Sequence, residues 1–196
     1  MKNRTITIGR EFGSGGRTIG RMAAQQLGIP CYDQEIIEKL VEKGGFSAEY
    51  IKERGELMVS EGWNAVLGRT GGPTRQDQLW VMQKNLILEL AEQGPCVIVG
   101  RCADFILSHR EDVLKVFVRS TMQKRSQRIL QVYGQREESV EQRLRIKDHQ
   151  RAEYYKMYTG HEWGGSRYYD LVLNSAKFSL EACVKTIIDL YQADSD

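Results

Sequence analysis

The sequence lacks several features that would assign it to a specialised class of protein. It has only three prolines in 196 residues, and no hydrophobic run approaches the roughly 18 residues of a membrane-spanning helix. Met1 is not followed by the apolar segment and small-residue cleavage site of a secretory signal. The four cysteines form no Cys-x-x-Cys pair and the three histidines are scattered, which argues against a zinc site. We therefore expect a cytoplasmic protein with reduced thiols.

An excess of one charge is also missing. Lys and Arg number 28 against 26 for Asp and Glu, and a net charge of +2 is too small to indicate a nucleic-acid or membrane partner. The basic residues are locally concentrated, with nine Lys/Arg against four Asp/Glu in residues 119–151. RNA binding through this segment is an alternative, but base-stacking aromatics are not interleaved with the charge. The hydrophobic content of 41% is that of an ordinary globular protein, and the oligomeric state stays open.

Short apolar segments alternate with segments of helical periodicity along the whole chain. This order predicts a three-layered α/β fold with a parallel sheet, in one domain spanning 1–196. The expected strands are 5–8, 29–33, 96–99, 114–118 and 171–173. The expected helices are 18–27, 34–43, 76–92, 102–109, 120–133, 137–158 and 179–192, with a loop at 68–73 inside the mostly helical region 47–94.

A glycine-rich loop follows the first expected strand and precedes a helix. It reads Gly-Arg-Glu-Phe-Gly-Ser-Gly-Gly-Arg-Thr over residues 9–18. Glycines let successive N–H groups converge on an anion at a helix N-terminus, and a hydroxyl at Thr18 is suited to a phosphate-bound Mg²⁺. We predict that a triphosphate binds Gly13, Ser14, Gly15, Gly16, Arg17 and Thr18. The alternative is a tight turn without a ligand.

The loop departs from the usual P-loop pattern because no register supplies the lysine. In GxxxxGK[ST], Glu11 replaces the first glycine and Arg17 replaces the lysine. In GxxGxGKxT, Arg10 replaces the first glycine and Gly16 replaces the lysine. Arg17 is a candidate for the missing charge, although a guanidinium is not equivalent to an ammonium.

Later segments add a resemblance that covers residues 5 to about 190. The segments are Val-Ile-Val-Gly-Arg at 97–101, Asp33 before a helix bearing Lys39, Lys-Asp-His-Gln-Arg at 147–151, and Tyr-Asp-Leu-Val-Leu-Asn-Ser at 169–175. Together with Gly-Arg-Glu-Phe-Gly-Ser-Gly-Gly-Arg, they resemble the cytidylate kinase-like family, a divergent branch of the P-loop nucleoside monophosphate kinases. The resemblance implies a five-stranded parallel P-loop NTPase core, a helical acceptor-binding insertion at 34–94 and a lid at 137–168.

The resemblance also implies roles for individual residues. Arg17, Asp148 and Arg151 would be catalytic, and Thr18 would bind Mg²⁺ together with ATP. Arg101 would face the acceptor phosphate, and Asp33, Lys39 and Lys147 would also bind the acceptor. Five of these residues have a simpler structural alternative: a surface cap for Arg101, a helix N-cap for Asp33, a solvated lysine for Lys39 and an (i, i+3) ion pair for Asp148 and Arg151.

The function implied is ATP-dependent phosphoryl transfer to a nucleoside monophosphate, with cytidylate favoured. Gln34 and Glu35 stand where the family pattern has Ser-Gly, and Glu35 adds a negative charge near the expected acceptor. A kinase of a non-nucleotide metabolite therefore stays an alternative. So does a catalytically weak module that senses a nucleotide.

Overall fold

The fold is built on one five-stranded parallel sheet. The computed structural model of the chain describes residues 4–56, 73–134 and 138–193. Its strands are ordered β2-β3-β1-β4-β5, and every neighbouring pair is parallel. Their bounds are β1 Thr5–Arg10, β2 Cys31–Tyr32, β3 Cys96–Val99, β4 Val113–Arg119 and β5 Leu171–Asn174. The predicted α/β architecture with a five-stranded parallel sheet is confirmed.

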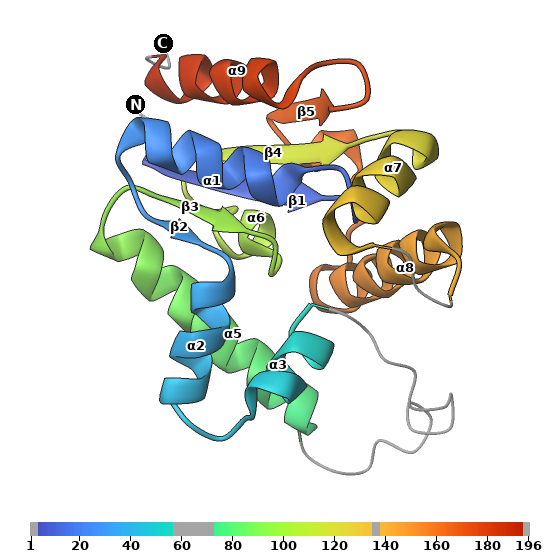
Figure 1. The fold of residues 1–196 in the computed structure, drawn as a ribbon. Coiled ribbons are helices and arrows are strands. Elements are labelled where there is room, and N and C mark those ends of the chain that lie inside the picture. Colours follow the sequence, from blue (N-terminus) through green and yellow to red (C-terminus); the bar gives the residue numbers. More distant parts are fainter. Residues whose placement is uncertain (1–3, 57–72, 135–137, 194–196) are drawn as a thin grey trace.

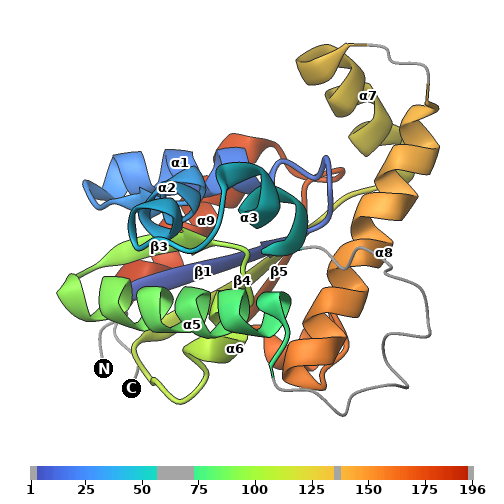
Figure 2. The same cartoon turned by 90° about the horizontal axis from the view of Figure 1, so that it is seen from below.

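Helices cover both faces of this sheet. One face carries α1 and α9, and the other carries α5 and α6, with α2 and α3 beside α5 (Figures 1 and 2). The helices are α1 Gly16–Leu27, α2 Gln34–Glu42, α3 Ala48–Arg54, α5 Arg75–Gln93, α6 Ala103–Ile106, α7 Met122–Tyr133, α8 Val140–Thr159 and α9 Leu180–Gln192. Within these described parts of the chain, we find no helix that could cross a membrane.

Two apolar cores lie on opposite sides of the sheet. Ile8 of β1 packs with Ile19 of α1 and Ile187 of α9 on one side. On the other side, Ile98 of β3 packs with Leu86 of α5 and other residues of the second core. Strands covered on both faces are apolar throughout, which is why short runs such as 96–99 were sufficient to predict them.

Several elements differ in length from the sequence-based expectation. β1 continues past 5–8 to Arg10, which pairs with Val118 of β4. β2 has only two residues, and the helix expected at 102–109 is limited to Ala103–Ile106. That helix starts late because Arg101 and Cys102 have positive φ angles of 59° and 54°, which a right-handed helix cannot contain. The loop predicted at 68–73 lies almost entirely outside the described residues.

The helices α7 and α8 lie beyond the carboxyl ends of the strands (Figure 2). Thr121 caps α7 by accepting a hydrogen bond from the Lys124 N–H, and Ser139 caps α8 in the same way from Gln142. In parallel sheets, ligands bind at this edge. The two helices therefore lie where they can supply side chains to a ligand site.

Candidate functional site

The loop between β1 and α1 presents backbone groups to this edge of the sheet. Gly13 and Gly15 have φ angles of +80° and +87°, in the left-handed region that residues with a Cβ rarely adopt. Gly15 is also the N-cap of α1, and no side chain caps this helix. The first N–H groups of α1 therefore have no partner within the helix, and the helix dipole favours an anion there. The loop has the form expected of a phosphate cradle.

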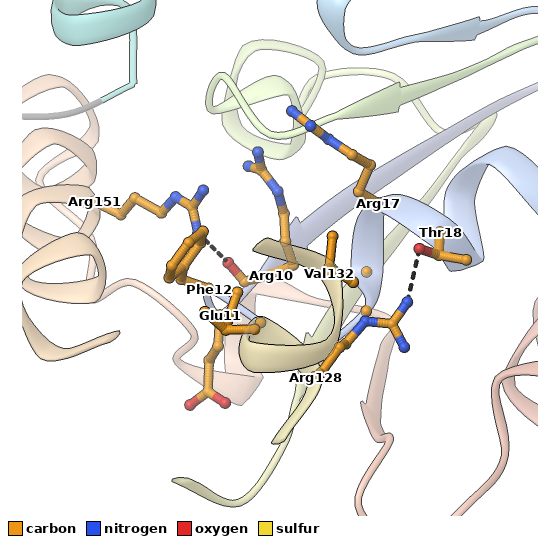
Figure 3. A pocket seen from close by; sticks show the side chains of 12 residues that line it. Arg10, Glu11, Phe12, Arg17, Thr18, Arg128, Val132 and Arg151 are labelled. Atoms are coloured by element: carbon orange, nitrogen blue, oxygen red, sulfur yellow. Dashed lines mark hydrogen bonds between the residues drawn. The ribbon is translucent and has the colours of Figure 1, made fainter. Parts of the chain in front are cut away.

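A cavity lies over the loop and is lined by arginines (Figure 3). Arg128 of α7 donates from Nη2 to Oγ1 of Thr18 at 2.8 Å. Arg151 of α8 donates from Nη1 to the Arg10 carbonyl at 3.4 Å, and its guanidinium lies 5.7 Å from the centre of the Phe12 ring. Two helices that are distant in sequence thus bring positive charge to the glycine loop.

Thr18 is suited to the metal role predicted for it. Its hydroxyl lies in the first turn of α1 and lines the loop cavity. The bond from Arg128 uses one of two lone pairs, so the oxygen retains capacity for a cation. A hydroxyl oxygen is a hard ligand of the type Mg²⁺ prefers.

Arg17 and Asp33 form an ion pair beside the loop. Nε of Arg17 lies 2.5 Å from Oδ2 of Asp33, and Arg21 lies 3.7 Å from the same oxygen. Asp33 is 4% exposed and occupies the N-cap position of α2, but its side chain makes no cap hydrogen bond. Instead, Glu35 accepts the Asp33 N–H at 3.0 Å. The N-cap alternative for the Asp33 side chain is therefore wrong, and the carboxylate faces the loop helix.

The charge of Glu35 is satisfied locally. Burial alone would raise its pKa, but hydrogen bonds from backbone N–H groups at the start of α2 hold that pKa below its usual range. Its oxygen is bound to the helix start rather than left free toward an acceptor. Glu35 therefore stays ionised, and backbone N–H groups and the charge of Arg21 offset part of its negative charge.

Asp148 and Arg151 have separate partners. Oδ1 of Asp148 accepts the Phe12 N–H at 2.7 Å, and its other oxygen pairs with Arg125 of α7. Nε of Arg151 lies 3.8 Å from Oε2 of Glu56, and the Arg151 side chain is 11% exposed. Burial and the charge of Arg10 lower the pKa of Arg151 to about 10. The contact of Asp148 with Phe12 thus connects α8 to the loop between β1 and α1, whereas Arg151 lies beside Glu56.

Glu56 lies at the centre of the arginines. It forms a bidentate ion pair with Arg10, in which Nη2 of Arg10 lies 2.9 Å from Oε2, and it accepts the Arg101 N–H at 3.3 Å. Burial alone would raise the pKa of Glu56, but the charges of Arg10 and Arg151 outweigh burial and hold the pKa far below its usual range. The carboxylate is thus held in its ionised form by the guanidinium groups of Arg10, Arg151 and Arg101.

A second cavity adjoins this carboxylate at the end of β3. Among the residues that line it are Arg10, Glu56, Gly100, Arg101 and Arg151. Arg10 and Arg151 line the loop cavity as well, so they lie between the two.

Arg101 is buried rather than exposed. It is 6% exposed, and its Nη1 donates to Gln83 at 3.2 Å and to the Ile51 carbonyl at 3.4 Å. Burial lowers its pKa despite the nearby Glu56. The alternative of a surface arginine is therefore wrong. The backbone of Arg101 is in the left-handed region, which costs about 1–3 kcal/mol. Residues strained in this way cluster at functional sites.

The two predicted lysines, unlike Arg101 and Arg151, are not cavity-lining residues. Lys39 lies in the last turn of α2 and Lys147 lies on α8, and both are half-buried. Neither is among the residues that line the two cavities. Burial and the charge of Arg151 lower the pKa of Lys147.

Sequence reasoning missed Arg10 and Glu56. Arg10 has a signal in the sequence, because it stands in place of a loop glycine, but that substitution alone indicates only a departure from the motif. Glu56 has none, since it lies 46 residues from Arg10 in a segment without a recognisable pattern.

Solved structures share this fold. An uncharacterized protein from Eubacterium ventriosum superposes with a TM-score of 0.75 at 24% identity, over 97% of this chain and 99% of that one. The shikimate kinase of Bacteroides thetaiotaomicron superposes with a TM-score of 0.58 at 16% identity, over 96% and 98% of the two chains. The fold is therefore that of P-loop kinases.

Curated relatives are similar over nearly their whole length. A cytidylate kinase from Methanothermobacter thermautotrophicus is 28% identical over 90% of this chain and 98% of the relative. A cytidylate kinase from Archaeoglobus fulgidus is 25% identical, covering 93% and 92%. The model of the cytidylate kinase-like family matches residues 5–177. This kinase family and this fold support a phosphotransferase. The chain belongs to the cytidylate kinase-like family.

Proposed function

We propose that the chain is an ATP-dependent kinase that phosphorylates a nucleoside monophosphate, with cytidylate as the favoured acceptor. The observation that carries the proposal is the pair of adjoining cavities that share Arg10 and Arg151. One contains the glycine loop, and the other lies at the end of β3. Phosphoryl transfer requires two anionic groups held side by side with their repulsion screened, and two cavities with arginines between them meet this need.

The donor side is the glycine loop. In the proposal, N–H groups at the start of α1 bind the phosphates of ATP, and Arg17 and Arg128 add positive charge. Mg²⁺, when bound with the nucleotide, would neutralise charge on the phosphate oxygens, and Thr18 is its protein ligand. Within the described residues, no cluster of three or more His, Cys, Asp or Glu could hold the ion alone.

The acceptor side is the cavity at the end of β3. Arg151 and Arg101 are the residues proposed to contact the acceptor phosphate, and Asp33 is proposed to bind its sugar or base. A pre-positioned guanidinium stabilises charge on the transferred group, and one such contact is worth about 10²–10³ in rate. Residues 34–94 and 137–168 remain the proposed acceptor insertion and lid. Lys39 and Lys147 require a movement to reach the acceptor, since both lie outside the cavity.

The choice of cytidylate is supported by the curated relatives, which are named cytidylate kinases and are 24–28% identical. A non-nucleotide acceptor is the second candidate. It is favoured by Glu56, whose carboxylate already occupies the arginine cluster that a monophosphate would need.

The test is ADP formation from Mg-ATP in a coupled assay with CMP, dCMP, UMP, AMP and GMP. We expect acceptor-dependent turnover that is greatest with CMP or dCMP and is lost in Arg151→Ala. Arg110→Ala is the matched control, because Arg110 pairs with Asp112 away from both cavities. ATP binding without turnover on any monophosphate would refute the acceptor assignment and favour a non-nucleotide acceptor or a sensing module.

A further inference from the structure

The missing lysine of the loop and the arginine in place of its first glycine are structurally coupled. In the register GxxGxGKxT, Gly16 occupies the lysine position and Arg10 the position of the first glycine. A Cβ built on Gly16 would lie 2.5 Å from Cβ of Arg10 and 3.1 Å from its Cγ. Two carbons cannot approach so closely, so Arg10 excludes any side chain at residue 16. The stem of Arg10 therefore fills the space in which a lysine at 16 would begin.

The guanidinium of Arg10 lies between the two cavities. It reaches the end of β3, where Gly100 has a φ of 75° and where a Cβ would collide with Nη1 of Arg10. Glu56 holds both terminal nitrogens of the guanidinium. Arg10 is 7% exposed, so a side chain normally found in water is fixed in the interior next to the loop.

Other arginines near the loop fit the lysine's role less well. Arg17 is 49% exposed in its side chain and is paired with Asp33. Arg128 reaches Thr18 from α7 and lines only the loop cavity of the two. Arg151 lines both cavities but comes from α8. Arg10 alone among these both lines the two cavities and belongs to the strand end that carries the loop.

We propose that Arg10 supplies the positive charge that a P-loop lysine supplies in other kinases, and that Glu56 positions its guanidinium between donor and acceptor. The inference rests on the proposed function, since it assigns a role within the same site. It makes Arg10 and Gly16 an exchanged pair. Compared with the pattern GxxGxGKxT, the basic residue stands at position 10 instead of 16, and the glycine stands at position 16 instead of 10.

An exchange experiment tests this directly. Arg10→Gly should lower acceptor-dependent turnover at least 100-fold and weaken binding of a fluorescent ATP analogue at least tenfold. Gly16→Lys alone should lower the melting temperature, because the new side chain has no room beside Arg10. Arg10→Gly combined with Gly16→Lys restores an ordinary loop and should recover at least tenfold of the lost ATP affinity and turnover. Arg110→Gly removes an arginine from the ion pair with Asp112 and should leave ATP affinity and turnover unchanged.

A second comparison tests the role of Arg10 even if the exchanged variant does not fold. Arg10→Met with Glu56→Gln removes both charges of the pair, so neither member is left buried and unpaired. Relative to wild type, this double variant should bind the ATP analogue at least tenfold more weakly. Wild-type affinity in this double variant, or in Arg10→Gly, would overturn the role of Arg10. Binding of the ATP analogue is measured separately from turnover. The role of Arg10 can therefore fail on unchanged binding while acceptor-dependent turnover still supports the kinase assignment. Conversely, the kinase assignment can fail for lack of turnover while the binding data still support the role of Arg10.

Discussion

Glu56→Gln should destabilise the protein far more than a similar change at the surface. The Glu56 side chain is 15% exposed and that of Arg10 is 9% exposed. Removing one partner of a buried pair leaves the other charge uncompensated, which costs about 3–5 kcal/mol. Glutamine retains a hydrogen-bond acceptor, so we expect about 3 kcal/mol, or a melting temperature about 6–12 °C lower for a chain of this size.

The matched control is Glu89→Gln. Glu89 pairs with Lys43, but the two side chains are 50% and 41% exposed, so the pair is worth less than about 1 kcal/mol. Urea unfolding monitored by tryptophan fluorescence gives both free energies of unfolding. If Glu56→Gln were no more destabilising than Glu89→Gln, Glu56 would not be the counter-charge of the arginine cluster, and the account of the site would be wrong.

Three further predictions follow from the site. The folded-state pKa of Glu56 is depressed, so its contribution to stability is present above the unfolded pKa of about 4.3 and is lost as the pH falls. In urea unfolding, wild type should therefore lose stability between about pH 5 and 3 more steeply than Glu56→Gln, and parallel curves would contradict this. Arg17→Ala should weaken ATP binding roughly tenfold, whereas Arg151→Ala should mainly lower turnover, by about 10²–10³. Steady-state kinetics and equilibrium binding separate these effects, and equal loss of affinity with intact turnover would remove both role assignments. Asp148→Asn should lower the free energy of unfolding by about 2 kcal/mol, because it weakens the hydrogen bond from the Phe12 N–H and the ion pair with Arg125. The same urea measurement checks this, and an unchanged midpoint would show that Asp148 does not fasten α8 to the loop.

The sheet was predictable because its strands are buried on both faces. Apolar runs such as 96–99 have few alternatives once they alternate with amphipathic helices. The end of β1 was not predictable in this way, because Arg10 is polar and is buried only through its pairing with Glu56. Neither residue has a local pattern that indicates a buried ion pair, and the pairing exists only once α3 packs near the end of β3.

The candidate site was predictable to the extent that it is local. The glycine loop and Thr18 follow from the spacing of ten residues, and their conformation agrees with it. The partners of Asp148 and Arg101 could not be derived, because Arg125, Phe12 and Gln83 come from other elements. Propensity and periodicity describe neighbours along the chain, whereas ion pairs across the sheet edge depend on how helices pack.

The most direct test of the kinase assignment is to detect the phosphorylated product itself. Mass spectrometry of a reaction containing Mg-ATP and CMP measures ADP and CDP together, and so separates transfer from simple ATP hydrolysis. The account predicts CDP and ADP in equal amounts, with both lost in Arg151→Ala and retained in Arg110→Ala. ADP without CDP or any other phosphorylated acceptor, or a product yield unchanged in Arg151→Ala, would contradict it.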